Sequence, residues 1–327
     1  MIIQLLISFF VALAVSVGAG YVVIPLLRRL KAEQLIQADG PVWHNSKQGT
    51  PTMGGIIFIL GVIIACFIAG AGEARNGNYQ HFFIFLFSFV FALVGFLDDY
   101  EKLKKKQNMG LTPKQKFSLQ LIVAIAFVII LHSTGSLTTN VYVPFFNTSF
   151  AVPAFLYYGF AAFVIVGTVN AVNITDGTDG LSTGVTIPVV VAFAVISFLW
   201  GDTANGIFAA AVAGGLVGFL IYNFYPAKVF MGDTGSLFLG GAVCALAFSL
   251  DIPLILITLG FVYFVETLSV IIQVSYFKIT KGKRVFKMAP IHHHFEMCGW
   301  NEYKVFAIFT AVSVIFAVIS VFGVLRK

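Results

Sequence analysis

Two adjacent carboxylates, Asp98 and Asp99, directly follow the apolar run 81–97. Neighbouring carboxylates repel each other, so such a pair requires a cation or a substrate that compensates its charge. A third carboxylate, Asp233, lies in the glycine-flanked turn 231–236, where backbone and side-chain oxygens can meet a hard cation. Together these residues indicate a site for a polyanionic ligand and a divalent metal. A polar helix end and a simple turn are the alternative interpretations.

A polar stripe continues from the apolar run 153–172. Asn170, Asn173, Asp176 and Asp179 recur every third residue, and on a continuing helix this spacing gathers side chains toward one face. Polar residues of this kind in membrane segments mark functional sites by default. The ligand spacing of a calcium-binding loop is absent, and a capping turn remains the alternative interpretation.

A basic loop before the last apolar run contains three successive histidines, His292, His293 and His294. Successive side chains point in different directions, so we do not expect the three to bind one zinc ion together. Charge and hydrogen bonds suit this loop to a diphosphate, with lipid headgroups as the alternative. Lys47, in a loop rich in glycine and hydroxyl groups, offers a further phosphate partner. Glu266, inside an apolar run, is either an interhelical hydrogen-bond partner or part of a lipid groove.

The composition indicates which elements must position these groups. Of the 327 residues, 59% are hydrophobic and 10% are charged, whereas an ordinary soluble domain carries about 25% charged residues. Lipid must therefore be the solvent for most of the surface. We predict an all-α polytopic membrane protein, a single domain over residues 1–327, in which about ten apolar segments span the bilayer. These segments lie at roughly 4–26, 54–71, 81–97, 117–132, 153–172, 182–200, 206–222, 235–250, 252–275 and 304–325.

The distribution of Lys and Arg predicts the orientation of the chain. With both termini on the outer side, all of the 20 Lys and Arg residues except Arg75, Arg326 and Lys327 fall in inner loops or at their edges. The carboxylate and histidine clusters fall on the same inner face. We therefore expect an active site that faces the cytoplasm.

Five strings of residues resemble the motifs of the polyprenyl-phosphate N-acetylhexosamine-1-phosphate transferase superfamily and, more narrowly, of its bacterial phospho-N-acetylmuramoyl-pentapeptide-transferases. The resemblance covers nearly the whole chain, and its narrowest signal is the histidine string, which differs in relatives that use UDP-N-acetylglucosamine. Ile174 stands where the family pattern has Leu, and this shift of one methyl group puts nothing in doubt. The strings are Gly49-Thr50-Pro51-Thr52-Met53-Gly54-Gly55, Asp98-Asp99-Tyr100, 170–181, Met231-Gly232-Asp233-Thr234-Gly235-Ser236 and Pro290-Ile291-His292-His293-His294-Phe295-Glu296.

The resemblance implies a reaction in the first membrane step of peptidoglycan synthesis. Phospho-MurNAc-pentapeptide would pass from UDP-MurNAc-pentapeptide to undecaprenyl phosphate, giving lipid I and UMP. The resemblance also implies Mg²⁺ as the cofactor, contact with membrane lipid, a homodimer, and a place in the bacterial cytoplasmic membrane. It gives no reason to expect a nucleic-acid partner.

The resemblance also implies roles for individual residues. Asp233 is the best metal ligand, with Asp99 and Asp176 near the metal or the substrate. Asp98 would either deprotonate the lipid phosphate or attack directly, and the sequence does not separate these mechanisms. The full catalytic set is Asp98, Asp99, Asp233, His292, His293 and His294, with the histidines on the diphosphate or the sugar.

Further residues would bind the substrates. Lysines would hold phosphates, the ring of Phe230 would stack on uracil, and amide and acidic side chains would read the nucleoside. The polyprenyl chain needs an apolar groove, and the predicted helix 252–275, with Glu266 and Gln273, is the expected wall. The substrate-binding set is Lys47, Thr52, Lys102, Lys114, Asn170, Asn173, Asp176, Asp179, Asn223, Phe230 and Gln273.

Three other functions compete with this one. A non-catalytic membrane scaffold would leave the Asp-Asp, Asn-Asn-Asp-Asp and Gly-Asp-Thr-Gly sets unexplained. A related transferase that uses UDP-N-acetylglucosamine would differ in its histidine loop. A secondary transporter would place its charged sites near the bilayer midplane and would often contain inverted repeats. In this sequence the carboxylates cluster at one interface and no repeat is visible, which favours the transferase.

Overall fold

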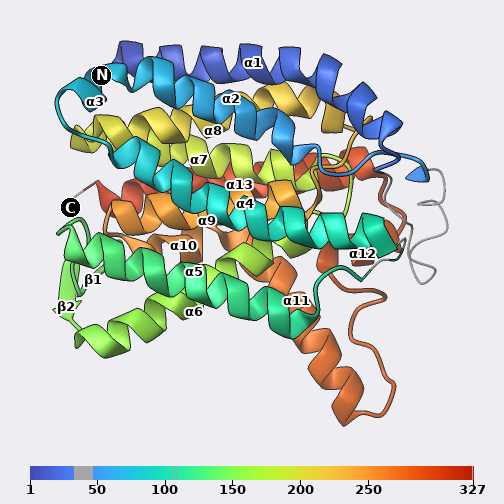
Figure 1. The fold of residues 1–327 in the computed structure, drawn as a ribbon. Helices are drawn as coiled ribbons and strands as arrows, with labels where there is room; N and C mark the ends of the chain where they lie inside the picture. Colours follow the sequence, from blue (N-terminus) through green and yellow to red (C-terminus); the bar gives the residue numbers. More distant parts are fainter. Residues whose placement is uncertain (33–46, 106, 108, 326) are drawn as a thin grey trace.

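The computed structural model describes residues 1–32, 47–105, 107, 109–325 and 327. Within this part of the chain, long helices run side by side as a bundle (Figure 1), which confirms the predicted all-α membrane fold. Among the described residues, nine helices are long and apolar enough to cross a membrane, and α2 is a shorter apolar helix. The helices are α1 Ile2–Arg29, α2 Gly55–Ala69, α3 Ala71–Arg75, α4 Gln80–Lys105, α5 Pro113–Ser133, α6 Ala154–Thr175, α7 Leu181–Trp200, α8 Thr203–Asn223, α9 Gly232–Ser249, α10 Leu256–Leu259, α11 Phe261–Ile279, α12 Ile291–Glu296 and α13 Glu302–Val324.

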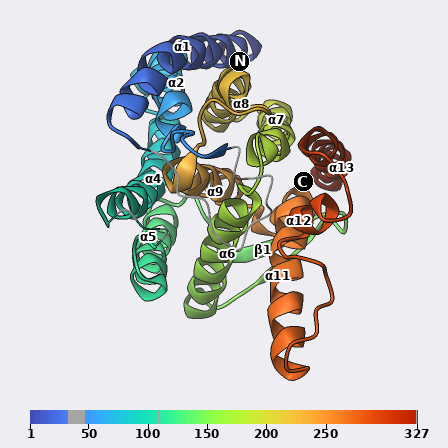
Figure 2. The ribbon, with the colours of Figure 1, turned by 90° about the vertical axis from the view of Figure 1, so that its right-hand side faces the viewer.

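One segment that was predicted as a single helix is interrupted in the structure. The segment 252–275 is not one helix but a short 3₁₀ turn, η2 Pro253–Ile255, followed by α10 and then by α11, with Gly260 between the two helices. A proline at the start and a glycine at the junction favour this interruption. After the break, α11 runs outward and ends beyond the rest of the bundle, as both ribbon views show (Figures 1 and 2).

Two smaller differences concern the ends of elements. The predicted helix 81–97 continues to Lys105 as α4, so that Asp98 and Asp99 lie inside the helix rather than at its end. The uncharged segment 133–152 contains a small antiparallel hairpin of strands β1 Asn140–Val143 and β2 Thr148–Ala151, in register Asn140↔Ala151.

Helix α9 is the centre of the bundle (Figure 2). Every residue of α9 except Gly232, Asp233 and Ser249 is buried. Close packing depends on small residues, because a Cβ atom at Gly95 of α4 would lie only 2.0 Å from the Asp233 carbonyl oxygen. At Gly240 of α9 it would lie 2.6 Å from Val169 Cα of α6. Small residues let membrane helices approach in this way, and the site is built where α4, α6 and α9 meet.

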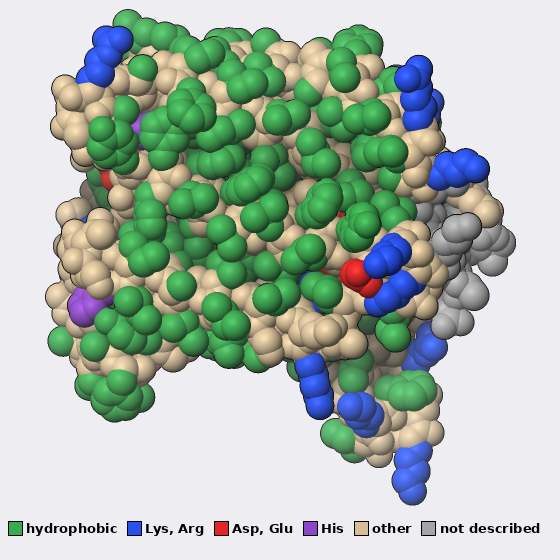
Figure 3. All heavy atoms as spheres, viewed as in Figure 1, with side chains coloured by type: hydrophobic (Ala, Val, Ile, Leu, Met, Phe, Trp, Pro, Cys, Tyr) green, Lys and Arg blue, Asp and Glu red, His purple; other side chains and the backbone are tan. Residues whose placement is uncertain are grey.

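The outer surface separates apolar from charged side chains. Figure 3 shows hydrophobic side chains over the flank of the bundle and most Lys and Arg side chains toward one end. Large apolar groups such as Phe163 on α6, with 77% of its surface exposed, have no protein neighbour to cover them. A lipid-facing flank accounts for both observations.

Candidate active site

The carboxylate of Asp99 joins α4 to the start of α9. Its Oδ1 accepts a hydrogen bond from the backbone N–H of Asp233 at 3.1 Å. Its Oδ2 accepts from the backbone N–H of Thr234 at 2.9 Å and from its hydroxyl at 2.7 Å. The two backbone N–H groups belong to the first turn of α9 and have no partner within the helix. A negative charge is also favourable at this end of the helix dipole. Asp99 therefore fixes the position of Asp233.

Two lysines bridge the carboxylates around this point. Lys102 Nζ lies 2.6 Å from Asp98 Oδ2 and 2.9 Å from Asp233 Oδ2. Lys116 Nζ, from α5, lies 2.7 Å from the same Asp233 oxygen. Oxygen atoms of Asp98, Asp99 and Asp233 all lie within 4.8 Å of one another. The predicted carboxylate pair and the distant Asp233 thus form one centre, called below the aspartate centre.

Helix α6 contributes amide side chains to the same place. Asn173 Nδ2 donates to Asp233 Oδ1 and to Ser236 Oγ, each at 2.8 Å. One turn earlier, Asn170 Nδ2 donates to Gln120 Oε1 of α5 at 2.7 Å. In the predicted polar stripe, Asn173 therefore orients Asp233, and Asn170 connects α6 to α5.

Asp176 follows the end of α6, and burial and nearby carboxylates raise its pKa. Burial, and then the carboxylates of Asp233, Asp99 and Asp179, raise the pKa of Asp176 to about 8. Repulsion between carboxylates has this direction. A cation placed among them would relieve it.

Lys47 lies in a second ionic cluster. Its Nζ is 2.7 Å from Asp179 Oδ1 and 2.7 Å from Glu302 Oε2. Burial acts to lower the pKa of Lys47, but the two carboxylates outweigh it and the pKa is raised. Asp179 also accepts from the backbone N–H of Ala227. The cluster joins the loop at residue 47, the turn after α6, the loop after α8 and the start of α13.

Two predicted substrate residues hold loops in place. Asn223 Oδ1 accepts from the Thr183 hydroxyl at 2.8 Å, and its Nδ2 donates to the Val229 carbonyl at 3.1 Å. The backbone N–H of Phe230 donates to the carbonyl of Pro51, and its ring remains half-buried.

Thr52 reaches the aspartate centre itself. A Cβ atom at Gly232, whose φ of +67° suits glycine, would lie 2.7 Å from both Thr52 Oγ1 and Asp99 Oδ2. Thr52 is therefore brought beside the metal-binding candidates, whereas Asn223 has both polar atoms in use within the protein.

The three histidines point to three different partners, as their succession predicted. His292 Nδ1 lies 3.0 Å from Glu266 Oε2, and both side chains are fully buried. His293 Nδ1 lies 2.6 Å from Glu296 Oε2, and His294 Nδ1 accepts from the backbone N–H of Lys287 at 3.1 Å. Glu266 is thus an interhelical partner, the first of the two predicted alternatives.

His292 also faces the site, because its ring fills the space that a side chain at Gly177 would occupy. Gln273 has a different place from the predicted lipid wall. Its Oε1 accepts from the backbone N–H groups of Val285 and Phe286 at 3.1 and 2.9 Å. Gln273 therefore closes the loop that follows α11.

The resemblance implied Lys114 on α5 as a phosphate partner, which stays a prediction, and the structure adds Lys116. Lys114 is exposed, whereas Lys116 contacts Asp233. The residue at which α5 starts decides which face of the helix each lysine occupies. Thr112 and Gln115 form a capping box that places the helix start at Pro113. That Thr-x-x-Gln pattern was the available signal. Glu302 and Gln120 were also not predicted, since neither lies in a recognisable string.

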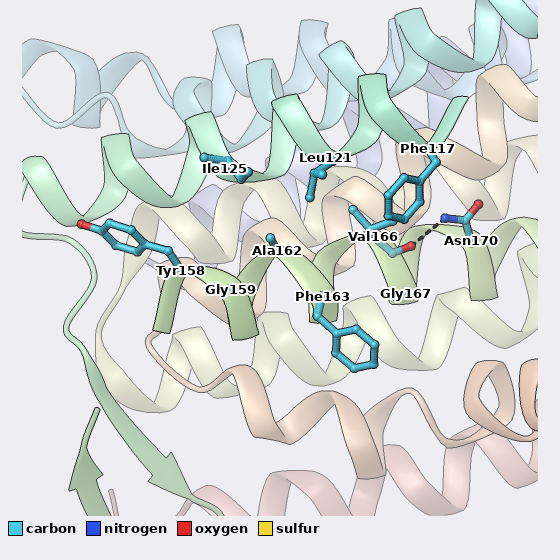
Figure 4. Close-up of a pocket in the computed structure, with 10 residues that line it drawn as sticks. All are labelled: Phe117, Leu121, Ile125, Tyr158, Gly159, Ala162, Phe163, Val166, Gly167 and Asn170. Carbon is cyan, nitrogen blue, oxygen red and sulfur yellow. Dashed lines mark hydrogen bonds between the residues drawn. The ribbon is translucent and has the colours of Figure 1, made fainter. Parts of the chain in front are cut away.

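An apolar groove opens between α5 and α6 (Figure 4). Its volume is about 500 Å³. Asn170 lies at one end and Tyr158 toward the other (Figure 4), and Asn170 is one helical turn from Asn173, the partner of Asp233. The lining residues are Phe117, Leu121, Ile125, Tyr158, Gly159, Ala162, Phe163, Val166, Gly167 and Asn170.

Known proteins identify the family of the chain. Residues 81–251 match the model of glycosyl transferase family 4, and residues 47–59 match phospho-N-acetylmuramoyl-pentapeptide-transferase signature 1. A phospho-N-acetylmuramoyl-pentapeptide-transferase of Clostridium acetobutylicum is 48% identical, with 96% of each chain covered. Proteins of the same name are 46% identical in Oceanobacillus iheyensis, with 97% of each chain covered, and in Staphylococcus carnosus, with 90% of this chain and 91% of the relative covered. The chain therefore belongs to the phospho-N-acetylmuramoyl-pentapeptide-transferase family.

Proposed function

We propose that this enzyme transfers phospho-MurNAc-pentapeptide from UDP-MurNAc-pentapeptide to undecaprenyl phosphate, forming lipid I and releasing UMP. The assignment of these two substrates is supported by membership of the family. The observation that carries the proposal is the aspartate centre, where three carboxylates and two ammonium groups meet at one end of a membrane-spanning bundle. Alternating positive and negative groups of this kind suit two phosphates that must approach each other.

The reaction exchanges one phosphoanhydride bond for another. An oxygen of the lipid phosphate attacks the sugar-linked phosphorus of the donor, and the bond from that phosphorus to the bridging oxygen breaks, so that the electron pair leaves with UMP. Lys102 and Lys116 offset the charge of the phosphates. Asp98 either accepts the proton of the lipid phosphate or attacks the donor phosphorus first; a hydrogen bond from the backbone N–H of Leu111 and the contact with Lys102 orient it for both roles.

The donor set fits Mg²⁺, which prefers oxygen ligands and usually binds through one or two carboxylates together with substrate phosphates. Asp98, Asp99 and Asp233 are the best candidates to hold it, because their carboxylate oxygens lie within 4.8 Å of one another. This set shares Asp233 and Asp99 with the set that the resemblance implies and adds Asp98, whereas Asp176 is not part of this close group. When bound, the ion would screen the phosphate charges and polarise the donor phosphorus.

The apolar groove between α5 and α6 is the proposed place for the polyprenyl chain. Its lining is apolar over most of its length, and the end at Asn170 is near the aspartate centre. A lipid phosphate at that end would lie close to Lys116, four residues before Gln120 on α5. The wall expected on the helix 252–275 stays an alternative place for the chain, and there Glu266 and Gln273 form hydrogen bonds within the protein.

The setting in the cell belongs to the same proposal. The concentration of Lys and Arg at the catalytic end supports a site on the cytoplasmic side of the bacterial inner membrane, with both termini outside. We treat residues 1–327 as one domain, because the aspartate centre and the Lys47 cluster draw on segments from the whole chain. The homodimer rests on the family resemblance.

Replacement of the Asp98 carboxylate by an amide tests this function. Asp98→Asn keeps the size of the side chain but removes its charge, and we expect turnover to fall by about 10²–10⁴-fold. Binding of UDP-MurNAc-pentapeptide, measured by calorimetry in detergent, is expected to stay within about threefold, because Lys102, Lys116 and the other carboxylates of the aspartate centre are unchanged. Near-normal turnover of the purified variant would refute the assignment of Asp98.

A further inference from the structure

The end of α11 carries an unusual combination of side chains. Residues 276–287, called here the α11 tip, include five basic residues and no acidic residue, and the nearest acidic residues in the sequence are Glu266 and Glu296. All five basic side chains are exposed. Within the described part of the chain, none of them forms an ion pair with a carboxylate. The five are Lys278, Lys281, Lys283, Arg284 and Lys287.

Exposed apolar side chains lie among these charges. Ile279 has 80% of its surface exposed, and Phe277 and Val285 are exposed to 43% and 48%. The same apolar surface continues back along α11 through Ile271 and Val274, which are also exposed. Since α11 is apolar and long enough to cross a membrane, lipid already adjoins its outer face.

The α11 tip is held in a fixed shape away from the bundle. Gln273 accepts from the backbone N–H groups of Val285 and Phe286, and the N–H of Gly282 donates to the carbonyl of Phe277. Both ribbon views show the end of α11 standing clear of the other helices (Figures 1 and 2). Lys and Arg side chains surround hydrophobic ones on this projection (Figure 3).

We infer that the α11 tip is a docking surface for anionic phospholipid headgroups. A membrane leaflet that contains anionic phospholipids would place acyl chains beside the apolar residues of the tip and phosphates beside its basic residues. Basic clusters directly after a membrane helix are attracted to anionic lipid, and this attraction adds up over several residues. An acidic protein would satisfy the charges but would leave the apolar face of α11 to lipid.

Lipid-specific fluorescence quenching tests this inference on the full-length protein without any substrate. A fluorophore is attached at Ile279→Cys in a Cys298→Ser background, since Cys66 and Cys244 are buried. The labelled protein is placed in phosphatidylcholine nanodiscs that contain a small fraction of spin-labelled phosphatidylglycerol or spin-labelled phosphatidylcholine. We expect phosphatidylglycerol to quench at least about threefold more strongly, because it collects around the tip.

Two changes should remove this preference. The triple variant K281Q/K283Q/R284Q should bring the quenching ratio close to one. A rise from 0.1 to 1 M salt should do the same, because it shortens the screening length from about 10 to about 3 Å. The matched control K104Q/K105Q, at a helix end where Lys105 already pairs with Glu101 at 2.8 Å, should keep the preference. Thermal melting checks that all variants are folded.

Other outcomes would overturn the inference. Equal quenching by the two lipids would mean that the tip does not select anionic headgroups, and no quenching by either would place it in water. Displacement of phosphatidylglycerol by one equivalent of undecaprenyl phosphate would assign the surface to the acceptor substrate instead. Because no turnover is measured, these results are independent of the proposed transferase function.

Discussion

At the scale of single residues, Lys114 and Lys116 form a matched pair on one helix. Lys116 contacts Asp233 at 2.7 Å, whereas Lys114 is exposed. We expect Lys116→Gln to lower kcat on the order of 10²-fold, the usual effect of losing one positioned donor at a charged transition state. Lys114→Gln should stay within about twofold of normal, as for other surface charges. Initial rates of UMP release measure both, and the opposite ranking would contradict the site geometry.

Residue types predicted the centre of the site better than its periphery. Asp98, Asp99 and Asp233 could be predicted to meet because each stands beside an apolar run and because unpaired carboxylates need compensation. Lys116 could not, since its direction depends on the exact start of α5. Asn223 and Gln273 were expected to bind substrates, but their polar atoms form hydrogen bonds within the protein, and such contacts depend on tertiary structure.

At the scale of elements, the close approach of α4 and α9 fixes the aspartate centre. A Cβ atom at Gly95 would lie 2.0 Å from the Asp233 carbonyl oxygen, so Gly95→Ala must push the helices apart. We expect a loss of about 1–3 kcal/mol of stability, as for other overpacked sites, together with loss of activity. Gly18→Ala, at a glycine with no atom within 4 Å, is the control and should be neutral or stabilising. Thermal melting in detergent compares the two, and equal melting would show that the helices do not pack this closely.

The groove between α5 and α6 yields a second prediction at this scale. A side chain at Gly167 would point into open space within the groove lining, so Gly167→Leu should fold and yet obstruct the polyprenyl chain. We expect KM for undecaprenyl phosphate to rise on the order of tenfold, the effect of about 1.4 kcal/mol of lost binding. KM for the donor should not change. Gly18→Leu serves as the control; an unchanged acceptor KM in Gly167→Leu would place the chain elsewhere.

Apolar runs predicted the helices well, because a span of about 20 apolar residues has few other solutions in a bilayer. They did not predict the break at Gly260. The run 252–275 is long enough for one straight span, and only Pro253 and Gly260 indicated otherwise. The outward course of α11 follows from that break, and so does the exposure of its basic tip.

At the scale of the whole molecule, segments far apart in the sequence meet at one end of the bundle. The aspartate centre joins α4, α5, α6 and α9, and the Lys47 cluster joins loops to the start of α13. Composition could predict the membrane class, and the distribution of charge could predict that the charged clusters gather at one end of the bundle. They could not predict which loops close over each other, because the ion pairs of Lys47 connect residues that are distant in the chain.

The most direct test of the proposed function is a reconstituted assay of the wild-type protein with undecaprenyl phosphate and Mg²⁺. Either UDP-MurNAc-pentapeptide or UDP-N-acetylglucosamine is supplied, and lipid product and UMP are measured. We predict equal amounts of lipid product and UMP from the muramoyl donor alone, and loss of both when EDTA removes the divalent cation. Lipid product from UDP-N-acetylglucosamine alone, or activity that EDTA leaves unchanged, would contradict the donor or the metal role proposed for the aspartate centre.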